Sequence, residues 1–594
     1  KKLEYRGYDS SGVAVWTGEG IQVRRKKGKI AILEAELAQN GLPPSPRALG
    51  HTRWATHGAP ADRNAHPHQD DRHEVVVAHN GIIENYSQLR EMLRAQGHRF
   101  TSDTDTEVLA NLIGSFHQQG RDLHTAVREA LQEVRGAYAI VAASAREPDT
   151  LVVARQDSPL VIGIGAEARY VASDMPALLN RTRRFLVLEN GETAVLTWNG
   201  QTIFSPRGEA VDREEFRCDW TPEQAEKGGF AHYMLKEIEE QPDVLARTAF
   251  DRFRDSVGDV QFRPSFGLED EALRGIRRLR FMGMGTSFHA ALLGQRLIGE
   301  LARIPGETVN ASEFLYGPRL LEEDALSVVI SQSGETADTL RAMREIQERG
   351  GRVAGICNVP GSTLAREADH LILTHCGPEV GVASTKAFFG QVTALYLLGI
   401  RLGRARGSLD ADQGRRCLGD LRRLRPRLER LRGSEFRDAI ARAVELLLPS
   451  TGCFFIGRGL QYPIALEGAL KLKEISYLHA EGYPAGEMKH GPIALLDARF
   501  PVVALATPGR THAKMLSNIE EVRARGSALI AVACRDDREV AERAEVVLPV
   551  PEVSELLAPL VNIVPLQRLA YHVALRLGRD IDQPRNLAKS VTVE

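Results

Sequence analysis

The pattern of apolar and polar positions changes once along this chain, after about residue 225. Before that point, short apolar runs bounded by turn residues predict strands, and longer stretches of helical character lie between them. Strands mixed with a few helices predict an α+β layered domain with largely antiparallel sheets. The runs that predict strands are 74–78, 137–142, 151–154 and 185–188, and the stretches that predict helices include 87–96 and 106–116.

After the change, a helical stretch over 232–249 leads into strands and helices that alternate regularly. Regular alternation of this kind predicts parallel α/β domains. Residues 226–594 are therefore expected to differ in architecture from the residues before them.

An internal repeat divides this second part. FMGMGTSFHAALLGQ, which starts at Phe281, resembles FIGRGLQYPIALEGA, and the matching glycines Gly283 and Gly457 are 174 positions apart. Further landmarks keep this order at offsets of 174 to 176: Glu313 with Glu487, 328–329 with 502–503, ADHLIL at 368 with AEVVLP at 544, and RLG at 401 with RLG at 576. The repeat predicts two copies of one doubly wound α/β domain, followed by a short tail.

Composition narrows the class of protein. A chain of 594 residues is too long for one hydrophobic core, and a net charge of -2 gives no reason to expect nucleic acid or an acidic membrane as a partner. Six scattered cysteines without a C-x-x-C pair favour reduced thiols in a cytoplasmic protein. The apolar runs are too short to span a bilayer. The sequence starts at Lys1 without methionine, within what reads as a folded segment.

Two loops rich in hydroxyl groups follow neighbouring predicted strands of the first α/β copy. One contains Thr286 and Ser287, and the other runs from Ser331 to Thr336, with Ser384 in a third segment. Such a loop opening a helix offers N–H groups, hydroxyls and the positive helix end to a phosphate. Helix capping is the simpler interpretation of one loop, but two at adjacent strand ends favour a phosphate site. The second copy has lost the serine cluster, so one sugar-phosphate site per chain is expected.

Three side chains of catalytic type share one helix face in the second copy. Glu467, Lys471 and Glu474 lie at i, i+4 and i+7, and periodicity alone favours a solvated, salt-bridged face. His490 lies in a loop before Gly-Pro, where a histidine is often only a surface residue. Lys589 lies in a polar C-terminal tail that also reads as a solvated basic terminus.

The first domain contains a dense polar segment, GHTRWATHG at 50–58, followed by NAHPH and HNGIIEN. His66, His68, His73 and His79 could ligate a metal. Pro67 separates the first pair and no ligand spacing completes a set, so a metal site is not expected.

Together these motifs resemble one family, the isomerising glutamine:fructose-6-phosphate aminotransferases. YRGYDSSG, HTRWATHG, NAHPH, HNGIIEN and SDTDTEV resemble its glutaminase domain, and GTS, SQSGETADTL, CNVPGS, GVASTKAF, ALEGALKLKEISY, KHGP and DQPRNLAKSVTVE resemble its sugar-isomerase (SIS) domains and tail. The resemblance implies an N-terminal-nucleophile-type αββα glutaminase domain followed by two doubly wound SIS domains. The expected boundaries are 1–217 for the glutaminase domain, 268–407 and 440–584 for the SIS domains, and 585–594 for the tail.

For glutamine, the resemblance implies that Arg53 holds the α-carboxylate and Asp105 the α-ammonium. Asn80 and the N–H of Gly81 would form an oxyanion hole. Thr56 and His57 would support the pocket, and Trp54 would gate the passage of ammonia.

For the sugar phosphate, the resemblance implies binding by the two hydroxyl-rich loops and by a third segment. His490 would assist ring opening, Lys589 would form an imine with the open-chain ketose, and Glu474 would move the proton between C1 and C2, with Lys471 and Glu467 close by. The expected binding residues are Thr286, Ser287, Ser331, Gln332, Ser333, Thr336, Val382 and Ser384, with Glu467.

The implied reaction converts L-glutamine and fructose 6-phosphate into glucosamine 6-phosphate and glutamate in a cytoplasmic homodimer, with no cofactor and no metal. The family begins with a Cys-Gly-Ile stretch that the sequence lacks, so this chain as it stands is expected to isomerise the sugar but not to hydrolyse glutamine. Met284 replaces a cysteine of many relatives, without expected effect. One alternative is a non-catalytic sugar-phosphate sensor, and the retention of Glu474, His490 and Lys589 argues against it. Another is a deglycase, which would not need the glutaminase segment.

Overall fold

A computed structural model describes residues 1–17, 20–198, 200–262, 266–318 and 320–592. The chain divides into two compact units, one formed by Lys1–Ala225 with Ala588–Glu594 and the other by Glu226–Leu587. The last two residues of the predicted tail, 593–594, lie outside the described residues. Each unit is described by itself.

The first unit contains three sheets whose strand pairs are antiparallel, as the sequence predicts. Their strand orders are β2-β1-β3, β14-β10-β8-β9 and β13-β12-β11-β7-β6-β5-β4. The strands are β1 Ser10–Thr17, β2 Gly20–Lys27, β3 Ala48–Arg53, β4 His68–Gln69, β5 Val75–Ile83, β6 Gly136–Ser144, β7 Leu151–Gln156, β8 Val161–Ile164, β9 Arg169–Ala172, β10 Arg184–Val187, β11 Thr193–Thr197, β12 Gly200–Phe204, β13 Ala210–Val211 and β14 Phe216–Arg217.

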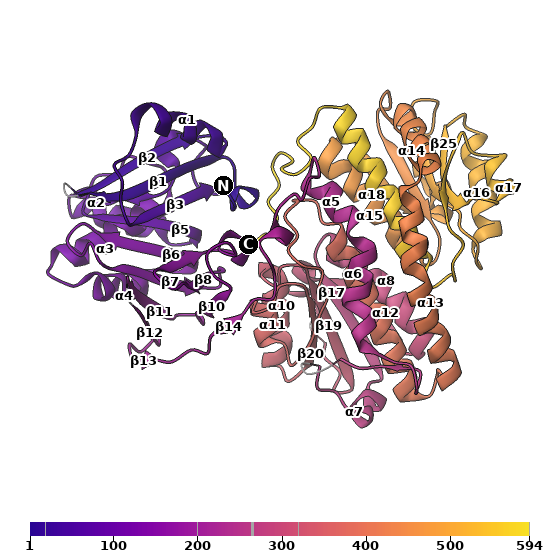
Figure 1. The fold of residues 1–594 in the computed structure, drawn as a ribbon, viewed down its shortest axis with the longest axis horizontal. Helices are drawn as coiled ribbons and strands as arrows, with labels where there is room; N and C mark the ends of the chain where they lie inside the picture. The colour runs from indigo at the N-terminus through magenta and orange to yellow at the C-terminus, as the bar shows by residue number, and fades with distance from the viewer. Residues whose placement is uncertain (18–19, 199, 263–265, 319, 593–594) are drawn as a thin grey trace. The chain divides into compact units, whose positions relative to one another are not determined.

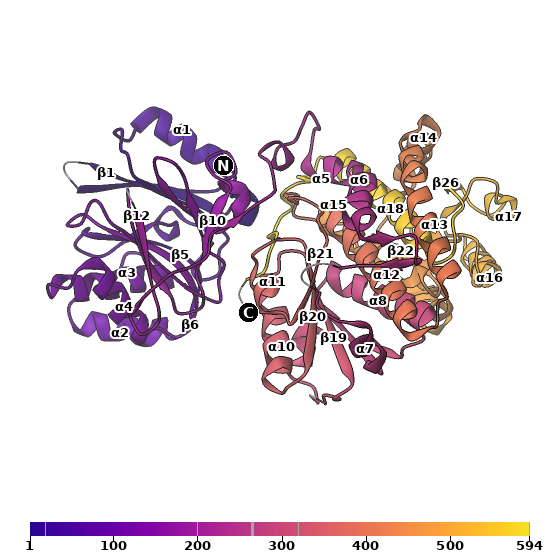
Figure 2. The ribbon, with the colours of Figure 1, turned by 60° about the horizontal axis from the view of Figure 1, so that its bottom comes forward.

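Helices α2 (Tyr86–Ala95), α3 (Asp105–Gln118) and α4 (Leu123–Glu133) gather on one side of the seven-stranded sheet (Figure 2). Side chains just before α3 and α4 start these helices: Thr104 accepts a hydrogen bond from the N–H of Glu107, and Asp122 accepts one from the N–H of Thr125. Each cap satisfies an N–H group that has no partner within its own helix. The cap at Thr104 fixes where α3 begins, and therefore where Asp105 lies.

The second unit contains two five-stranded parallel sheets with the same strand order, β18-β17-β19-β20-β21 and β23-β22-β24-β25-β26. Strands β18 and β23 begin and end 174 positions apart, the offset that the sequence repeat predicts. The predicted fold class is thus confirmed. The strands are β17 Arg278–Gly283, β18 Gly306–Asn310, β19 Ala325–Ser331, β20 Arg352–Cys357, β21 His370–Leu373, β22 Cys453–Gly457, β23 Ala480–Pro484, β24 Val502–Leu505, β25 Leu529–Cys534 and β26 Val546–Val550.

Helices cover both faces of the first of these sheets, with α10 and α11 on one side and α8 and α12 on the other (Figure 1). Helix α12 is buried almost all round, and α8 packs against both α12 and α15 of the second copy. One continuous apolar core therefore runs through both copies. The helices are α8 Thr286–Ala302, α10 Ala337–Glu348, α11 Thr363–Glu367, α12 Lys386–Arg406, α15 Gln461–Ser476, α16 His512–Arg523 and α18 Ala558–Arg576.

One predicted helical stretch, 232–249, proves to be two helices, α5 (Tyr233–Glu239) and α6 (Gln241–Ala249). Pro242 lies in the first turn of α6. Proline has no N–H to bond the preceding turn, so it is accommodated where a helix starts rather than where one continues. Among the described residues, no helix is both long and apolar enough to cross a membrane.

Candidate active sites

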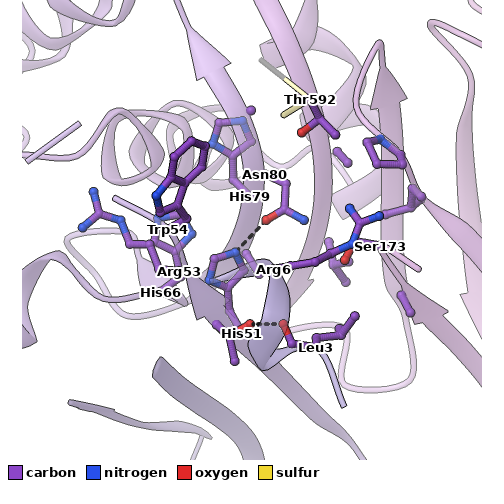
Figure 3. Close-up of a pocket in the computed structure, with 18 of the residues that line it drawn as sticks. Leu3, Arg6, His51, Arg53, Trp54, His66, His79, Asn80, Ser173 and Thr592 are labelled. Carbon is purple, nitrogen blue, oxygen red and sulfur yellow. Dashed lines mark hydrogen bonds between the residues drawn. The ribbon is translucent and has the colours of Figure 1, made fainter. Parts of the chain in front are cut away.

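The first unit contains a pocket with a cavity volume of about 160 Å³. Its walls come from β3, from the end of β5 and from the start of α3, and Figure 3 shows Arg53, Trp54 and Asn80 among the lining side chains. Thr592, in the stretch 588–594 that groups with this unit, also lines the pocket. Most residues predicted to bind glutamine are thereby brought together: Arg53, Trp54, Thr56, Asn80, Gly81 and Asp105.

A buried histidine fixes the orientation of the Asn80 side chain. His51 Nε2 lies 2.8 Å from Asn80 Oδ1, a contact that Figure 3 marks with a dashed line. Burial lowers the pKa of His51 to about 4, so the ring is neutral near pH 7 and its Nε2–H donates to the amide oxygen. The oxygen is thereby occupied, and the Asn80 NH₂ group is left to donate. This is the arrangement that an oxyanion hole requires.

Glycine is required next to Asn80. Gly81 has φ +135°, and a Cβ built there would lie 2.0 Å from the carbonyl oxygen of Ala137 on the neighbouring strand β6. Any larger residue would push β5 away from β6 at the point where Asn80 faces the pocket. The conformation of Gly81 therefore maintains the geometry of the predicted oxyanion hole.

The Arg53 guanidinium lies largely buried on β3. Its Nη2 donates to the carbonyl oxygens of His57 and Gly58, and its Nη1 has no hydrogen-bond partner among the described residues. Burial lowers the pKa of Arg53, and the carboxylates of Asp105 and Asp9 oppose that effect. A buried cation with one free N–H edge is suited to bind a carboxylate.

Asp105 opens α3, where the positive end of the helix favours an acid. Its Oδ2 accepts a hydrogen bond from the N–H of Ile83, at 3.0 Å. One carboxylate oxygen is thus used to hold the end of β5 against α3. The predicted contact between Asp105 and an α-ammonium group would use the other oxygen.

In the wall of the pocket, neutral histidines surround a threonine. Thr106 Oγ1 lies 3.0 Å from His79 Nδ1 and 3.3 Å from His66 Nε2, and the rings of His51 and His66 stack at 4.4 Å. His68 Nε2 lies 3.1 Å from the hydroxyl of Thr104, the residue before α3. One ring nitrogen each of His66, His68 and His79 thus contacts a hydroxyl. No cluster of three or more ligand-type side chains suited to a metal occurs among the described residues.

These histidines make the first unit sensitive to acid. Burial lowers the pKa values of His51, His66, His68 and His79 below 6.5, so the unfolded chain binds more protons than the folded chain once the pH falls below 6.5. Their contribution to stability is complete above pH 6.5 and is lost as the pH falls toward the folded-state values. For His51 alone, the drop to about 4 corresponds to about 3 kcal/mol.

Tryptophan fluorescence can follow this loss in one unit, because all four tryptophans lie before residue 226. We expect the urea midpoint reported by fluorescence to fall between pH 7 and pH 5, and to fall less in a His51→Gln variant. A midpoint that stays constant over this range would contradict the prediction.

In the second unit, the two hydroxyl-rich loops lie at the carboxyl ends of adjacent strands, β17 and β19. Ligands of open parallel sheets bind at this edge, next to helix N-termini. Gly334 has φ +68°, and a Cβ there would lie 2.1 Å from Ser362 Oγ, so the tight turn before α10 requires glycine. The loops thus open α8 and α10, as the sequence predicts.

The serine hydroxyls of these loops keep a hydrogen to donate. Ser331 Oγ and Ser333 Oγ accept hydrogen bonds from the N–H groups of Gly334 and Glu335, and Ser287 Oγ accepts one from the Gln391 amide. An accepting hydroxyl still has its own O–H. Ser331 Oγ also lies 3.1 Å from Thr336 Oγ1, so one hydroxyl of this pair donates to the other. The bonds within the turn explain the loop's shape, and the hydroxyl hydrogens that remain suit a phosphate.

Ser384 and Val382 lie just before α12. Glu379 accepts hydrogen bonds from the Ser384 hydroxyl and from the N–H groups of Thr385 and Ala387, which holds this segment at the helix N-terminus. The N–H of Val382 donates to the carbonyl oxygen of Asp582 at 3.1 Å. Glu379 thus ties the third predicted binding segment to the start of α12.

Glu467 and Lys471 of α15 are fully buried, which excludes the solvated face that periodicity alone favours. Lys471 Nζ lies 2.6 Å from Glu474 Oε2 and 3.4 Å from Glu467 Oε1, and it donates to Thr286 Oγ1 at 3.1 Å. The Thr286 hydroxyl in turn donates to Glu467 Oε1 at 3.0 Å. The predicted catalytic side chains of the second copy are therefore linked to the phosphate loop of the first.

Lys471 carries a permanent charge in this network. Burial alone would lower its pKa, but the nearby carboxylates of Glu467 and Glu474 outweigh burial and raise it. The ammonium group therefore stays protonated throughout the range in which proteins are stable.

Two further predicted residues lie elsewhere. His490 ends a short 3₁₀ helix, Ala485–His490, and is exposed. In the tail, the N–H of Arg585 donates to the Tyr477 hydroxyl and its guanidinium lies over the Tyr477 ring. Lys589 belongs to the stretch that groups with the first unit, and its role stays a prediction.

Sequence reasoning missed His51, Gln391 and His289, each of which contacts a predicted site residue, and Thr106, which lines the pocket of the first unit. His51 and Arg53 share one face of β3 because strand residues two apart point the same way, a signal that was available. The others meet their partners from distant segments, and no local spacing reveals that.

Both units match families of known proteins. A family model for a glutamine amidotransferase domain matches residues 51–180, and one for a SIS domain matches 272–401 and 446–577. The glutamine--fructose-6-phosphate aminotransferase [isomerizing] of Thermus thermophilus is 50% identical over 594 residues, which is 100% of this chain and 96% of the relative. The chain belongs to this family of enzymes. Relatives of the same name from Gloeobacter violaceus and Methanosarcina acetivorans are 48% and 46% identical, over 100% of this chain and 97% of each.

A solved structure agrees with this membership. The C-terminal domain of glucosamine-fructose-6-phosphate aminotransferase from Francisella tularensis is 39% identical, has a TM-score of 0.57, and covers 60% of this chain and 99% of its own. The family resemblance that the sequence motifs indicate is thus confirmed.

Proposed function

We propose that this protein converts L-glutamine and fructose 6-phosphate into glucosamine 6-phosphate and glutamate. The observation that carries the proposal is the contact of Lys471 Nζ with both Glu474 and Thr286. This contact links the Glu474–Lys471 pair, which could act as acid and base, to the Thr286 loop, which is suited to bind a phosphate. A protein that only sensed a sugar phosphate would not need a buried ammonium group there.

The first unit would release ammonia from glutamine. Arg53 would bind the α-carboxylate through its free Nη1, and Asp105 would bind the α-ammonium. Thr56 and His57 would support the side chain, and Trp54 would gate the exit of ammonia. Asn80 and the Gly81 N–H would stabilise the oxyanion that forms when a thiolate attacks the amide carbon. The orientation that His51 gives to Asn80 supports this assignment.

The second unit would bind the sugar and isomerise it. Ser287, Ser331, Gln332, Ser333 and Thr336 would bind the phosphate, and Val382 and Ser384 would contact sugar hydroxyls. The Thr286 hydroxyl is already used by Glu467 and Lys471, so we assign its contribution to the N–H at the start of α8. Glu474 would take a proton from C1 of the open-chain imine and return it to C2, which converts the ketose imine into the amino aldose.

His490 and Lys589 would act before that step. His490 is exposed on its own chain, which fits a role in the site of a second copy in a homodimer. It would transfer the proton that opens the sugar ring, and Lys589 would then form the imine at C2 with loss of water. Ammonia would displace the Lys589 amine from C2, which frees the lysine and gives the imine on which Glu474 acts. We propose a glutaminase domain over 1–217, SIS domains over 268–407 and 440–584, a tail over 585–594, and a cytoplasmic location.

The Lys589 assignment predicts a covalent adduct. Borohydride reduces an imine to a stable amine, so treatment with fructose 6-phosphate and borohydride should attach the sugar to a C-terminal peptide, detected by mass spectrometry of a digest. The adduct should disappear in Lys589→Ala and persist in Lys514→Ala, which removes an exposed lysine of α16. An adduct on another lysine would show that the tail has a different role.

The proposed reaction is tested by its product. Protein that includes the family's N-terminal Cys-Gly-Ile stretch, supplied with amide-¹⁵N glutamine and fructose 6-phosphate, should form ¹⁵N-labelled glucosamine 6-phosphate, whereas the 594-residue chain without that stretch should not. A sensor would bind fructose 6-phosphate without product, and a deglycase would consume glucosamine 6-phosphate without using glutamine. Either of these results would refute the proposal.

A further inference from the structure

We propose that His289 is a positioning residue for isomerisation, which holds Glu467 so that the Lys471 ammonium stays with Glu474. The inference rests on the function proposed above. His289 belongs to α8 of the first copy, three positions after Thr286, so both side chains face α15. His289 thus reaches a carboxylate of the second copy that the reaction itself does not use.

The contacts of Glu467 carry the argument. The side chain is fully buried, and its two oxygens have different partners. Oε1 accepts from the Thr286 hydroxyl and lies 3.4 Å from Lys471 Nζ, whereas Oε2 lies 2.7 Å from His289 Nδ1. A carboxylate only accepts, so His289 presents its Nδ1–H to this oxygen.

This arrangement controls how one ammonium group is shared between two carboxylates. With both oxygens of Glu467 bonded, Lys471 lies nearer to Glu474, at 2.6 Å, than to Glu467, at 3.4 Å. Without His289, Oε2 would be a buried charged acceptor with no partner, which is strongly unfavourable. Lys471 is the nearest group that can compensate, so it would shift toward Glu467 and away from Glu474.

This movement of the Lys471 ammonium group would change the basicity of Glu474. A carboxylate that loses a neighbouring cation binds its proton more readily. The titratable groups around Lys471 are Glu467 and Glu474 on its own helix, His289 on α8, and Glu379 before α12, which also acts on Lys471. Replacing His289 leaves all three carboxylate side chains in place.

The test compares His289→Leu with His289→Asn in the conversion of fructose 6-phosphate to glucose 6-phosphate, an isomerisation that needs no glutamine. Leucine removes the donor. Asparagine retains one, because its Nδ2 occupies nearly the place of the histidine Nδ1. We expect His289→Leu to lower kcat about 10-fold with KM nearly unchanged, and to move the acidic limb of the pH profile of kcat/KM upward by about one unit. His289→Asn should restore most of both.

His512→Leu provides a matched control. His512 Nε2 lies 2.6 Å from Asp537 Oδ2 at the start of α16, a comparable histidine–carboxylate pair of the same unit outside the network. This variant should keep the pH profile. If His289→Leu loses activity without a shift of the profile, or if His289→Asn fails to restore it, His289 has only a structural role and the inference is wrong.

A crystal structure of His289→Leu separates this inference from the proposed function. We expect the Lys471 ammonium to lie closer to Glu467 than to Glu474 in the variant. An unchanged contact with Glu474 would overturn the inference even if the wild-type protein catalyses another reaction. Absence of isomerisation by the wild-type protein would instead count against the proposed function.

Discussion

Glu474→Gln is expected to abolish isomerisation while leaving the affinity for fructose 6-phosphate nearly intact. An amide has the shape of the carboxylate but cannot accept the proton from C1, so the rate should fall on the order of 10²–10⁴-fold. The phosphate would still bind the loops before α8 and α10. Lys471 would keep Glu467 as a partner, which limits the structural damage. Isomerisation kinetics and calorimetric binding of fructose 6-phosphate measure the two effects separately.

Glu345→Gln is the matched control. The Glu345 side chain of α10 is 21% exposed and paired with Arg349, the residue after this helix. The Glu474 side chain is 20% exposed and paired with Lys471. Removing this charge should leave turnover unchanged. Normal turnover in Glu474→Gln would place Glu474 among structural ion pairs and would leave the proton transfer without a base.

Asn80→Ala is expected to lower glutamine hydrolysis by about 10²–10³-fold with little change in glutamine affinity. The Asn80 amide would donate to the oxygen only when that oxygen becomes negative, so its loss affects the transition state more than the bound substrate. Asn80→Asp keeps the shape and the contact with His51 but replaces the donor with an acceptor, and it should be at least as slow. Glutamate release by the full-length enzyme measures the rate.

Asn190→Ala tests whether such an effect is specific. Asn190 is also half-buried in the first unit, where its amide donates to Asp157 at 2.7 Å. This variant is expected to lose some stability and to keep its rate. If Asn80→Ala raised KM and preserved kcat, Asn80 would contribute to binding and the oxyanion hole would need another donor.

Local pattern was sufficient to predict most of the fold. Antiparallel strands in the first unit and two parallel sheets with one strand order follow from apolar runs, turn residues and a repeat whose offset stays between 174 and 176. The break between α5 and α6 was missed because the helical pattern on both sides of Glu240 is continuous, although Pro242 marks the start of a helix.

The site was predictable to a smaller extent. Spacing placed Glu467, Lys471 and Glu474 on one helix face, but burial decides whether such a face is catalytic or solvated, and burial depends on α8, which lies far away in the sequence. His289 and Glu467 are 178 positions apart and meet only because the two copies pack together. Contacts of this kind follow from tertiary packing, which single-sequence patterns do not contain.

The packing of α8 against α15 shows how the repeat has specialised. The first copy retains the serine loops, and the second has lost them but supplies Glu467, Lys471 and Glu474. The network therefore depends on both copies, because each supplies groups that the other lacks. Loss of either copy would leave the hydroxyl-rich loops without the buried ion pairs, or the ion pairs without the loops.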